Sequence, residues 1–326
     1  MRGIDERRSP GGFTIAGKNP FEAASRARKS MTKLAQHEAA FVALWVVSLV
    51  VGWRSLAEVF SLSSRNDEYT YVLLVLPISA ALIFLDRRAL RALVTLNVRA
   101  GSALLVAAVL IACTSFGWPV LSGDAQLSVR MLALVLSWIG AFELCFGSRA
   151  ARLVLFPLCF LFGLVPPPQH FLVAIVALLQ QGSAWTAHLL FAAFGIPVAQ
   201  DDVMLTIPGL TLQVAQECSS IRSSLMLLVT TIVLAYLLLR SSWRRTLLIA
   251  LAVPLSVAKN GLRIFTIAML GTRVDSGYLT GRFHHQGGIV FFAIALFGIF
   301  ALLWILQRGE DLPLEPGPSP AKSIAT

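Results

Sequence analysis

The 326-residue sequence contains few charged residues, and this shortage excludes a soluble globular protein. Asp, Glu, Lys and Arg make up 13% of the chain and hydrophobic residues 56%, whereas a soluble domain has about 25% charged residues. Several nearly uncharged stretches have about 15–25 residues, the length that a helix needs to cross a ~30 Å hydrocarbon core. Because backbone polar groups in lipid must be satisfied internally, the sequence predicts an all-α, polytopic membrane helical bundle.

Cysteine is also scarce, and the arrangement of the basic residues is not that of a nucleic-acid-binding protein. The four cysteines show no CxxC spacing, which argues against a zinc site or a disulfide framework. The net charge of +10 comes from an N-terminal arm and short loops, as the positive-inside rule expects, and no basic face with interleaved aromatic residues is present. We therefore expect a lipid bilayer as partner and no nucleic acid. A long basic arm precedes the first apolar run, so we expect no cleavable signal peptide.

The apolar runs divide the chain into three parts. Residues 1–37 form a basic cytosolic arm, with an interfacial helix expected across Pro20–Gln36. Residues 38–307 form the transmembrane domain, and residues 308–326 form a Pro-rich, disordered cytosolic tail. The apolar runs lie near residues 39–57, 70–85, 101–121, 129–147, 153–165, 170–195, 219–239, 246–270 and 287–307.

The charges of the loops predict the orientation of the bundle. Arginine-rich loops alternate with loops that are poor in positive charge, which places the basic set and both termini in the cytoplasm. The chain leaves the cytoplasm at Arg152 and has returned by Arg240, so residues 153–195 must make one net crossing although they contain two apolar runs. We expect the run 170–195 to lie at the surface, which leaves about eight crossings. This run contains Gln180, Gln181, Trp185 and His188.

The segment between residues 196 and 217 differs in character from the apolar runs. Its sequence, IPVAQDDVMLTIPGLTLQVAQE, alternates with β-branched residues and is interrupted by Asp201-Asp202 and Pro208-Gly209. This pattern predicts a hairpin or short strands. The same orientation places the segment outside the cytoplasm, immediately before Cys218.

Three reactive residue types fall at one predicted membrane depth. Cys218 opens a helix that begins outside, and Arg263 lies 18 residues after the cytoplasmic Arg245, about 27 Å along a helix. His284 and His285 immediately precede the last helix, again on the outer side. A thiol, a guanidinium and an imidazole together supply a nucleophile, an oxyanion stabiliser and a general acid/base for acyl transfer.

Each of these residues also has a purely structural explanation. Membrane cysteines are mostly packing residues, and we assign Cys113, Cys145 and Cys159 to that class because each lies within an apolar run. Arg263 near a helix end could snorkel toward the interface, a histidine pair at a helix start is often interfacial, and Asn260 could join two helices by a hydrogen bond.

The same residues lie in motifs that resemble those of the exosortase/archaeosortase family. The segment Gln216–Ser223 (QECSSIRS) is similar to the cysteine motif of that family, and Lys259–Ile264 (KNGLRI) to its Asn-x-x-Arg-Ile motif. His284 is followed four residues later by Gly288 and then by aromatic residues, which resembles the third motif and favours His284 over His285. The resemblance covers roughly residues 40–307. Glu217 and Ser220 stand where the family commonly has Ala and Gly.

The resemblance implies a sortase-like cysteine transpeptidase in the inner membrane, with its active site on the extracytoplasmic side. Its expected partners are exported proteins with a C-terminal sorting signal, which comprises a short motif such as PEP, a transmembrane helix and a basic cluster. Cys218 would attack the peptide carbonyl, Arg263 would stabilise the oxyanion and His284 would transfer the proton, with Asn260, Ser219 and Arg222 in support. The resemblance implies no cofactor and no metal, and it leaves the acceptor unidentified.

Two other functions also fit a polytopic helical protein. A transporter or polysaccharide-export component would use Arg263 and the histidines to line a polar path, and discontinuous helices in paired half-repeats would favour it. The sequence shows neither feature. An auxiliary membrane subunit without chemistry is the third alternative.

Overall fold

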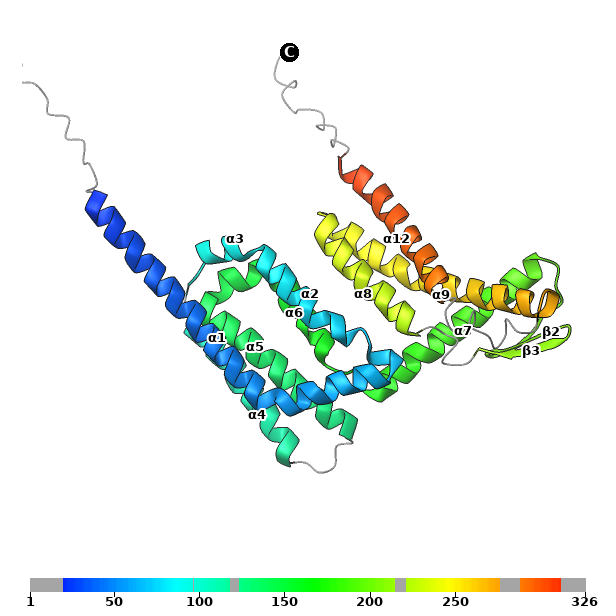
Figure 1. Ribbon diagram of the computed structural model, residues 1–326, viewed down its shortest axis with the longest axis horizontal. Helices are drawn as coiled ribbons and strands as arrows, with labels where there is room; N and C mark the ends of the chain where they lie inside the picture. Colours follow the sequence, from blue (N-terminus) through cyan, green and yellow to red (C-terminus); the bar gives the residue numbers. More distant parts are fainter. Residues whose placement is uncertain (1–19, 96, 118–122, 215–220, 276–287, 312–326) are drawn as a thin grey trace, which may run out of the picture.

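The chain folds into a long helical bundle with one small sheet (Figure 1). The computed structural model describes residues 20–95, 97–117, 123–214, 221–275 and 288–311. Within these ranges, eight helices are long and apolar enough to cross a membrane, and the only sheet has three strands. The predicted fold, an all-α membrane bundle with about eight spans and a short strand segment before Cys218, is therefore confirmed.

The helices form two groups that lie side by side along the long axis of the molecule (Figure 1). Aromatic and aliphatic side chains around Trp138 and Phe142 fill the core of the first group. The first group comprises α1 (Pro20–Arg65), η1 (Asp67–Tyr69), α2 (Val72–Leu85), α3 (Arg87–Ala92), α4 (Val98–Gly117), α5 (Gly123–Leu153), α6 (Leu155–Phe160) and η2 (Leu161–Leu164). The second group comprises α7 (Gln169–Ala193), α8 (Ile221–Leu238), α9 (Ser242–Arg273) and α12 (Gly288–Asp311).

The N-terminal helix is longer than the sequence suggested. Residues 20–36 are helical as expected, but they are not a separate element, since α1 continues without interruption to Arg65. Its apolar part, Leu34–Arg65, is the first candidate span. The domain boundary at residue 37 therefore falls inside a continuous helix, and the cytosolic position of the preceding arm stays a prediction.

The prediction that residues 170–195 form the surface element is wrong. Helix α7 has 25 residues and is itself a candidate span, whereas the short apolar segment is Leu155–Leu164, with 10 residues. Two of the residues that suggested a surface position, Gln180 and Gln181, bind residues that flank the strands instead. Gln180 Nε2 donates to the carbonyl oxygen of Val214 (3.3 Å), and Gln181 Nε2 donates to Oδ1 of Asp202 (3.1 Å). Residues 153–195 still make one net crossing if α7 spans the membrane and Leu155–Leu164 enters it without crossing.

The sheet is an antiparallel meander with strand order β1-β2-β3. Its strands are β1 (Ala199–Asp201), β2 (Met204–Ile207) and β3 (Leu210–Gln213). Two-residue turns join them, and Pro208-Gly209 forms the second turn, where Gly209 adopts a φ of 84° that a side chain would disfavour. The turns therefore fall at the two interruptions that the sequence indicated.

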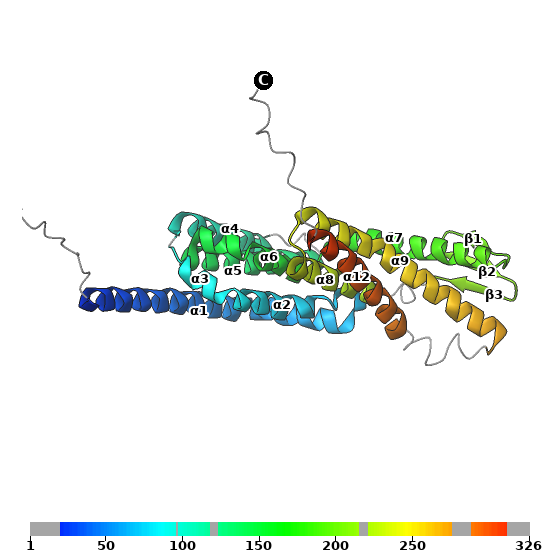
Figure 2. The same cartoon turned by 90° about the horizontal axis from the view of Figure 1, so that it is seen from above.

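One face of the sheet rests on the second helix group (Figure 2). Leu205 and Ile207 are buried against Ala184 and Phe191 of α7 and Ala268 of α9. Because strand residues alternate between the two faces, Thr206, Thr211 and Gln213 lie on the opposite, exposed face. The sheet thus covers the C-terminal halves of α7 and α9.

The loop charges predict that this sheet is extracytoplasmic. We expect a membrane-impermeant maleimide to label an Asp201→Cys protein in intact cells, because Asp201 is exposed in β1. An Arg240→Cys protein, changed in the exposed loop between α8 and α9, should be labelled only after permeabilisation. The unsubstituted protein gives the background from the native cysteines. The opposite labelling pattern would reverse the orientation and remove the depth agreement of the candidate site.

Candidate functional site

The structure describes part of the predicted constellation. Cys218 and Ser219 lie in residues 215–220, and both His284 and His285 lie in residues 276–287, so these four residues are outside the described ranges. Arg263, Asn260 and Arg222 lie within them. The site is therefore built here from α9 and the elements that pack around it.

Arg263 is a buried arginine near one end of a long spanning helix. Helix α9 has 32 residues, about 48 Å at ~1.5 Å per residue, which exceeds the ~30 Å hydrocarbon core. Arg263 is 21 residues after Ser242, about 31 Å along the axis, and only 8% of its surface is exposed. A side chain that remains charged at this depth and degree of burial indicates a functional or structural demand for the cation.

A second buried cation, Lys259, lies one helical turn before Arg263. Lys259 is 5% exposed, and its Nζ donates a hydrogen bond to Oγ of Ser223 in the first turn of α8. Residues four apart share one face of a helix, so the ammonium and the guanidinium point to the same side of α9. This contact holds the beginning of α8 against α9, one helical turn before Arg263. Helix α8 begins three residues after Cys218 in the sequence.

Sequence reasoning assigned no role to Lys259. The signal was present, because a lysine inside an apolar helix four residues from an arginine places two charges on one buried face. Its partner Ser223 could not be identified without the packing of α8 on α9.

Asn260 joins two helices, which was the structural alternative for this residue. It is 1% exposed, and its Nδ2 donates to Oγ of Ser183 in α7 at 2.9 Å. Lys259 and Asn260 therefore bind α8 and α7, respectively, from adjacent positions on α9. This polar layer fixes α9 between its two neighbours directly before Arg263.

Glycines bring α7 and α9 into close contact at the same level. A Cβ atom at Gly261 would lie 2.5 Å from Cβ of Thr186 and 3.1 Å from the backbone nitrogen of Ala187. A Cβ atom at Gly182 would lie 2.9 Å from Cγ1 of Val257. Small residues at a helix crossing allow the backbones to approach, which positions side chains such as Asn260 for interhelical hydrogen bonds.

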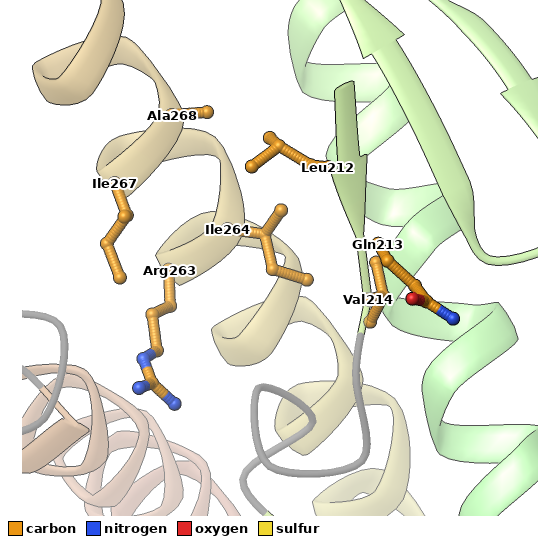
Figure 3. A pocket seen from close by; sticks show the side chains of 7 residues that line it. All are labelled: Leu212, Gln213, Val214, Arg263, Ile264, Ile267 and Ala268. Atoms are coloured by element: carbon orange, nitrogen blue, oxygen red, sulfur yellow. The ribbon is translucent and has the colours of Figure 1, made fainter. Parts of the chain in front are cut away.

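A cavity lies between this part of α9 and the end of β3 (Figure 3). Leu212 and Ile264 point toward each other in its centre, whereas Gln213 points away from α9. The lining is apolar except for Gln213 and Arg263, so Arg263 is the one charged residue there among the described residues. Its guanidinium extends away from Leu212 and Ala268 (Figure 3). The lining residues are Leu212, Gln213, Val214, Arg263, Ile264, Ile267 and Ala268.

Arg222 is not part of the cavity lining. Although it lies in the first turn of α8, its Nη1 is 3.3 Å from Oδ1 of Asp67 in η1. Both side chains are largely exposed, and such pairs typically contribute about 0–1 kcal/mol. Arg222 therefore connects α8 to the first helix group, and its predicted support of the catalytic constellation stays a prediction.

The described residues offer no metal site. Within residues 20–95, 97–117, 123–214, 221–275 and 288–311, no group of three His, Cys, Asp or Glu side chains could hold an ion. Three of the four cysteines are described: Cys113 and Cys159 are exposed on helix surfaces and Cys145 is buried, and all three are free thiols.

Comparison with known proteins identifies the family to which the sequence is similar. A family model described as transmembrane exosortase (Exosortase_EpsH) matches residues 63–301, about three quarters of the chain. The match extends from the end of α1 into α12 and includes the cavity with Arg263. The comparisons with curated proteins and with solved structures each gave no match.

The close approach of α7 and α9 makes a prediction about stability. A Gly261→Ala substitution forces Cβ into Thr186, and such overpacking typically costs about 1–3 kcal/mol. We expect a lower thermal unfolding temperature for the purified protein in detergent. Gly288→Ala is the matched control, because a Cβ atom there meets nothing within 4 Å. Equal unfolding temperatures for the two variants would show that the α7–α9 contact is not closely packed.

Proposed function

This chain belongs to the transmembrane exosortase family, and on that basis we propose that it is an intramembrane cysteine transpeptidase for exported proteins. Membership of the family implies a transmembrane protein of PEP-CTERM protein sorting. The proposed substrate carries a C-terminal signal of a short motif, a transmembrane helix and a basic cluster. The enzyme resides in the inner membrane and acts on the extracytoplasmic side.

The observation that carries the proposal is the position of Arg263. This buried residue lines a cavity at the end of β3, and β3 ends five residues before Cys218 in the sequence. The Lys259–Ser223 hydrogen bond holds the other flank of Cys218, the first turn of α8, against the same part of α9. The candidate nucleophile is thus flanked on both sides by segments that contact α9 near Arg263.

The proposed reaction is an acyl transfer in two steps. The Cys218 thiolate attacks the carbonyl carbon of the scissile peptide bond, and the electron pair of the C=O bond moves to the oxygen. Arg263 donates hydrogen bonds to this oxyanion. As the oxyanion collapses, the C–N bond breaks, His284 protonates the leaving amine, and a thioester remains on Cys218.

The second step resolves the thioester. His284, now neutral, accepts the proton of the acceptor nucleophile as this group attacks the thioester carbonyl, and the C–S bond breaks to return the Cys218 thiolate. A lipid or surface-polymer group as acceptor gives transpeptidation, and water gives hydrolysis. The imidazole of His285 is the alternative proton carrier. Every bond change uses groups of this chain, the substrate and the acceptor.

Burial in a bundle favours Arg263 for the oxyanion role. Arginine remains protonated in proteins and presents a planar set of five N–H donors, so it can place two donors on one oxygen. In a water-poor cavity such a donor stabilises developing charge more strongly than it would in water. The apolar lining from Leu212, Ile264 and Ile267 supplies that environment.

The nucleophile assignment is tested by replacing the cysteines singly. We expect Cys218→Ala to abolish processing of a tagged substrate while the protein still accumulates in the membrane. Cys113→Ala, Cys145→Ala and Cys159→Ala should retain processing, since these thiols lie within helices away from the predicted constellation and have no assigned role. Substrate cleavage and protein level are measured together by immunoblot. Normal processing by Cys218→Ala would exclude the cysteine mechanism and favour a transporter or auxiliary subunit.

The oxyanion assignment is tested at Arg263 by a substitution that keeps the charge. Lysine lacks the planar fork, so we expect Arg263→Lys to be nearly as inactive as Arg263→Ala. Removing one oxyanion donor typically lowers turnover about 10²–10³-fold. The initial rate of substrate cleavage in isolated membranes measures the loss. Near-normal cleavage by Arg263→Lys would identify a structural cation, because a snorkelling arginine can be replaced by lysine.

A further inference from the structure

Among the described residues, the outer edge of β3 is unpaired, and this edge lies beside the candidate site. Strand β3 is an outer strand, and no further strand lies beyond it within the described parts of the chain. The backbone N–H of Val214 donates to the carbonyl of Val203 (2.9 Å), which fixes the alternation of the antiparallel ladder. Leu210 and Leu212 therefore direct their backbone groups toward β2, and Thr211 and Gln213 direct theirs toward the open edge.

This edge leads to the residues assigned to catalysis. Leu212, Gln213 and Val214 line the same cavity as Arg263, and the chain continues from Val214 to Cys218 over four residues. The opposite edge of the sheet is formed by β1, and the turn that follows β1 binds α7 through the Gln181–Asp202 hydrogen bond. Of the two outer strands, only β3 contributes residues to the Arg263 cavity.

The substrate itself creates a need for such an edge. The scissile peptide bond lies on the N-terminal side of the substrate's transmembrane helix. A nucleophile can reach the carbonyl carbon of this bond only when the segment around it is extended. Backbone N–H and C=O groups that have left a helix near the hydrocarbon core are costly unless they find new partners. An open strand edge at this level supplies partners at every second residue, which is the principle of recognition by strand addition.

We propose that the open edge of β3 binds the substrate as an added strand. The occupant is the extended segment of the exported protein directly before its C-terminal transmembrane helix, and it pairs with the backbone of Thr211 and Gln213. Its side chains alternate between solvent and the apolar cavity of Leu212, Val214 and Ile264. This inference rests on the proposed function and names the binding surface that precedes the chemical step.

Site-specific crosslinking tests where the substrate lies. A photoreactive amino acid is placed at Gln213 or, as control, at Gln200, which is exposed at least in part and lies in the opposite outer strand. The Cys218→Ala protein is used so that substrate binds in membranes without turnover. We expect position 213 to capture the segment before the substrate's transmembrane helix, and position 200 to capture none. Capture of another part of this chain, of a second copy, or of no substrate overturns the proposal.

Proline substitutions test whether the backbone is the binding group. Gln213→Pro removes an N–H that points to the open edge and is not used within the sheet, so we expect about fivefold slower substrate cleavage, the effect of one net hydrogen bond. Gln213→Ala keeps the N–H and should lose less. Gln200→Pro removes the corresponding outward N–H of β1 and should leave cleavage unchanged. Equal effects of Gln213→Pro and Gln200→Pro would show that only the sheet was disturbed.

These outcomes separate the docking proposal from the proposed function. If Cys218→Ala abolishes processing but position 213 captures no substrate, the cysteine mechanism stands and the docking surface is wrong. If position 213 captures substrate but Cys218→Ala processes it normally, the docking surface stands and the nucleophile is wrong.

Discussion

The structure depends on keeping two charged side chains inside an otherwise apolar bundle. Lys259 and Arg263 lie on one face of α9, and both are almost completely buried. A charged side chain inside a spanning helix is costly, so it is tolerated where the protein surrounds it. Hydrogen-bond partners and neighbouring helices must therefore surround this face. The Lys259–Ser223 bond meets this demand and sets how α8 lies against α9, and the Asn260–Ser183 bond beside it does the same for α7. The same constraint gives the bundle its polar layer.

The sheet solves a related problem at the end of the bundle. Helices α7 and α9 are longer than the core of a bilayer, and their C-terminal halves need cover for Phe191, Ile264 and Ala268. A meander with two-residue turns supplies one apolar face to these helices and one polar face to solvent. The candidate site then lies where the charged level of α9 meets the sheet. The packing of the sheet on α7 and α9 thus both covers these helices and positions the candidate site.

Much of this arrangement could be predicted from the sequence because it depends on local periodicity and length. Uncharged runs of sufficient length gave the spans, and the distance from Arg245 to Arg263 placed Arg263 in the C-terminal half of one helix, where α9 has it. Its depth in the membrane stays a prediction. The turns at Asp202 and Pro208-Gly209 could be located from residue type alone. The role of residues 170–195 could not, because Gln180 and Gln181 look like surface residues until the sheet supplies their partners. The partner of Lys259 depends equally on packing between distant segments. The placement of Cys218 and His284 beside Arg263 stays a prediction.

The length of β3 limits how much of a substrate the backbone can inspect. With four residues in the strand, only Thr211 and Gln213 direct their N–H and C=O groups outward. A peptide held there is read over about two or three positions, and backbone pairing itself ignores side-chain identity. Backbone pairing over so few positions provides little sequence specificity, too little to select a few exported proteins from many. In the proposed mode of binding, discrimination among exported proteins therefore depends on side-chain contacts of the short motif and on the transmembrane helix and basic cluster. The extended segment sets the register that determines which bond is presented.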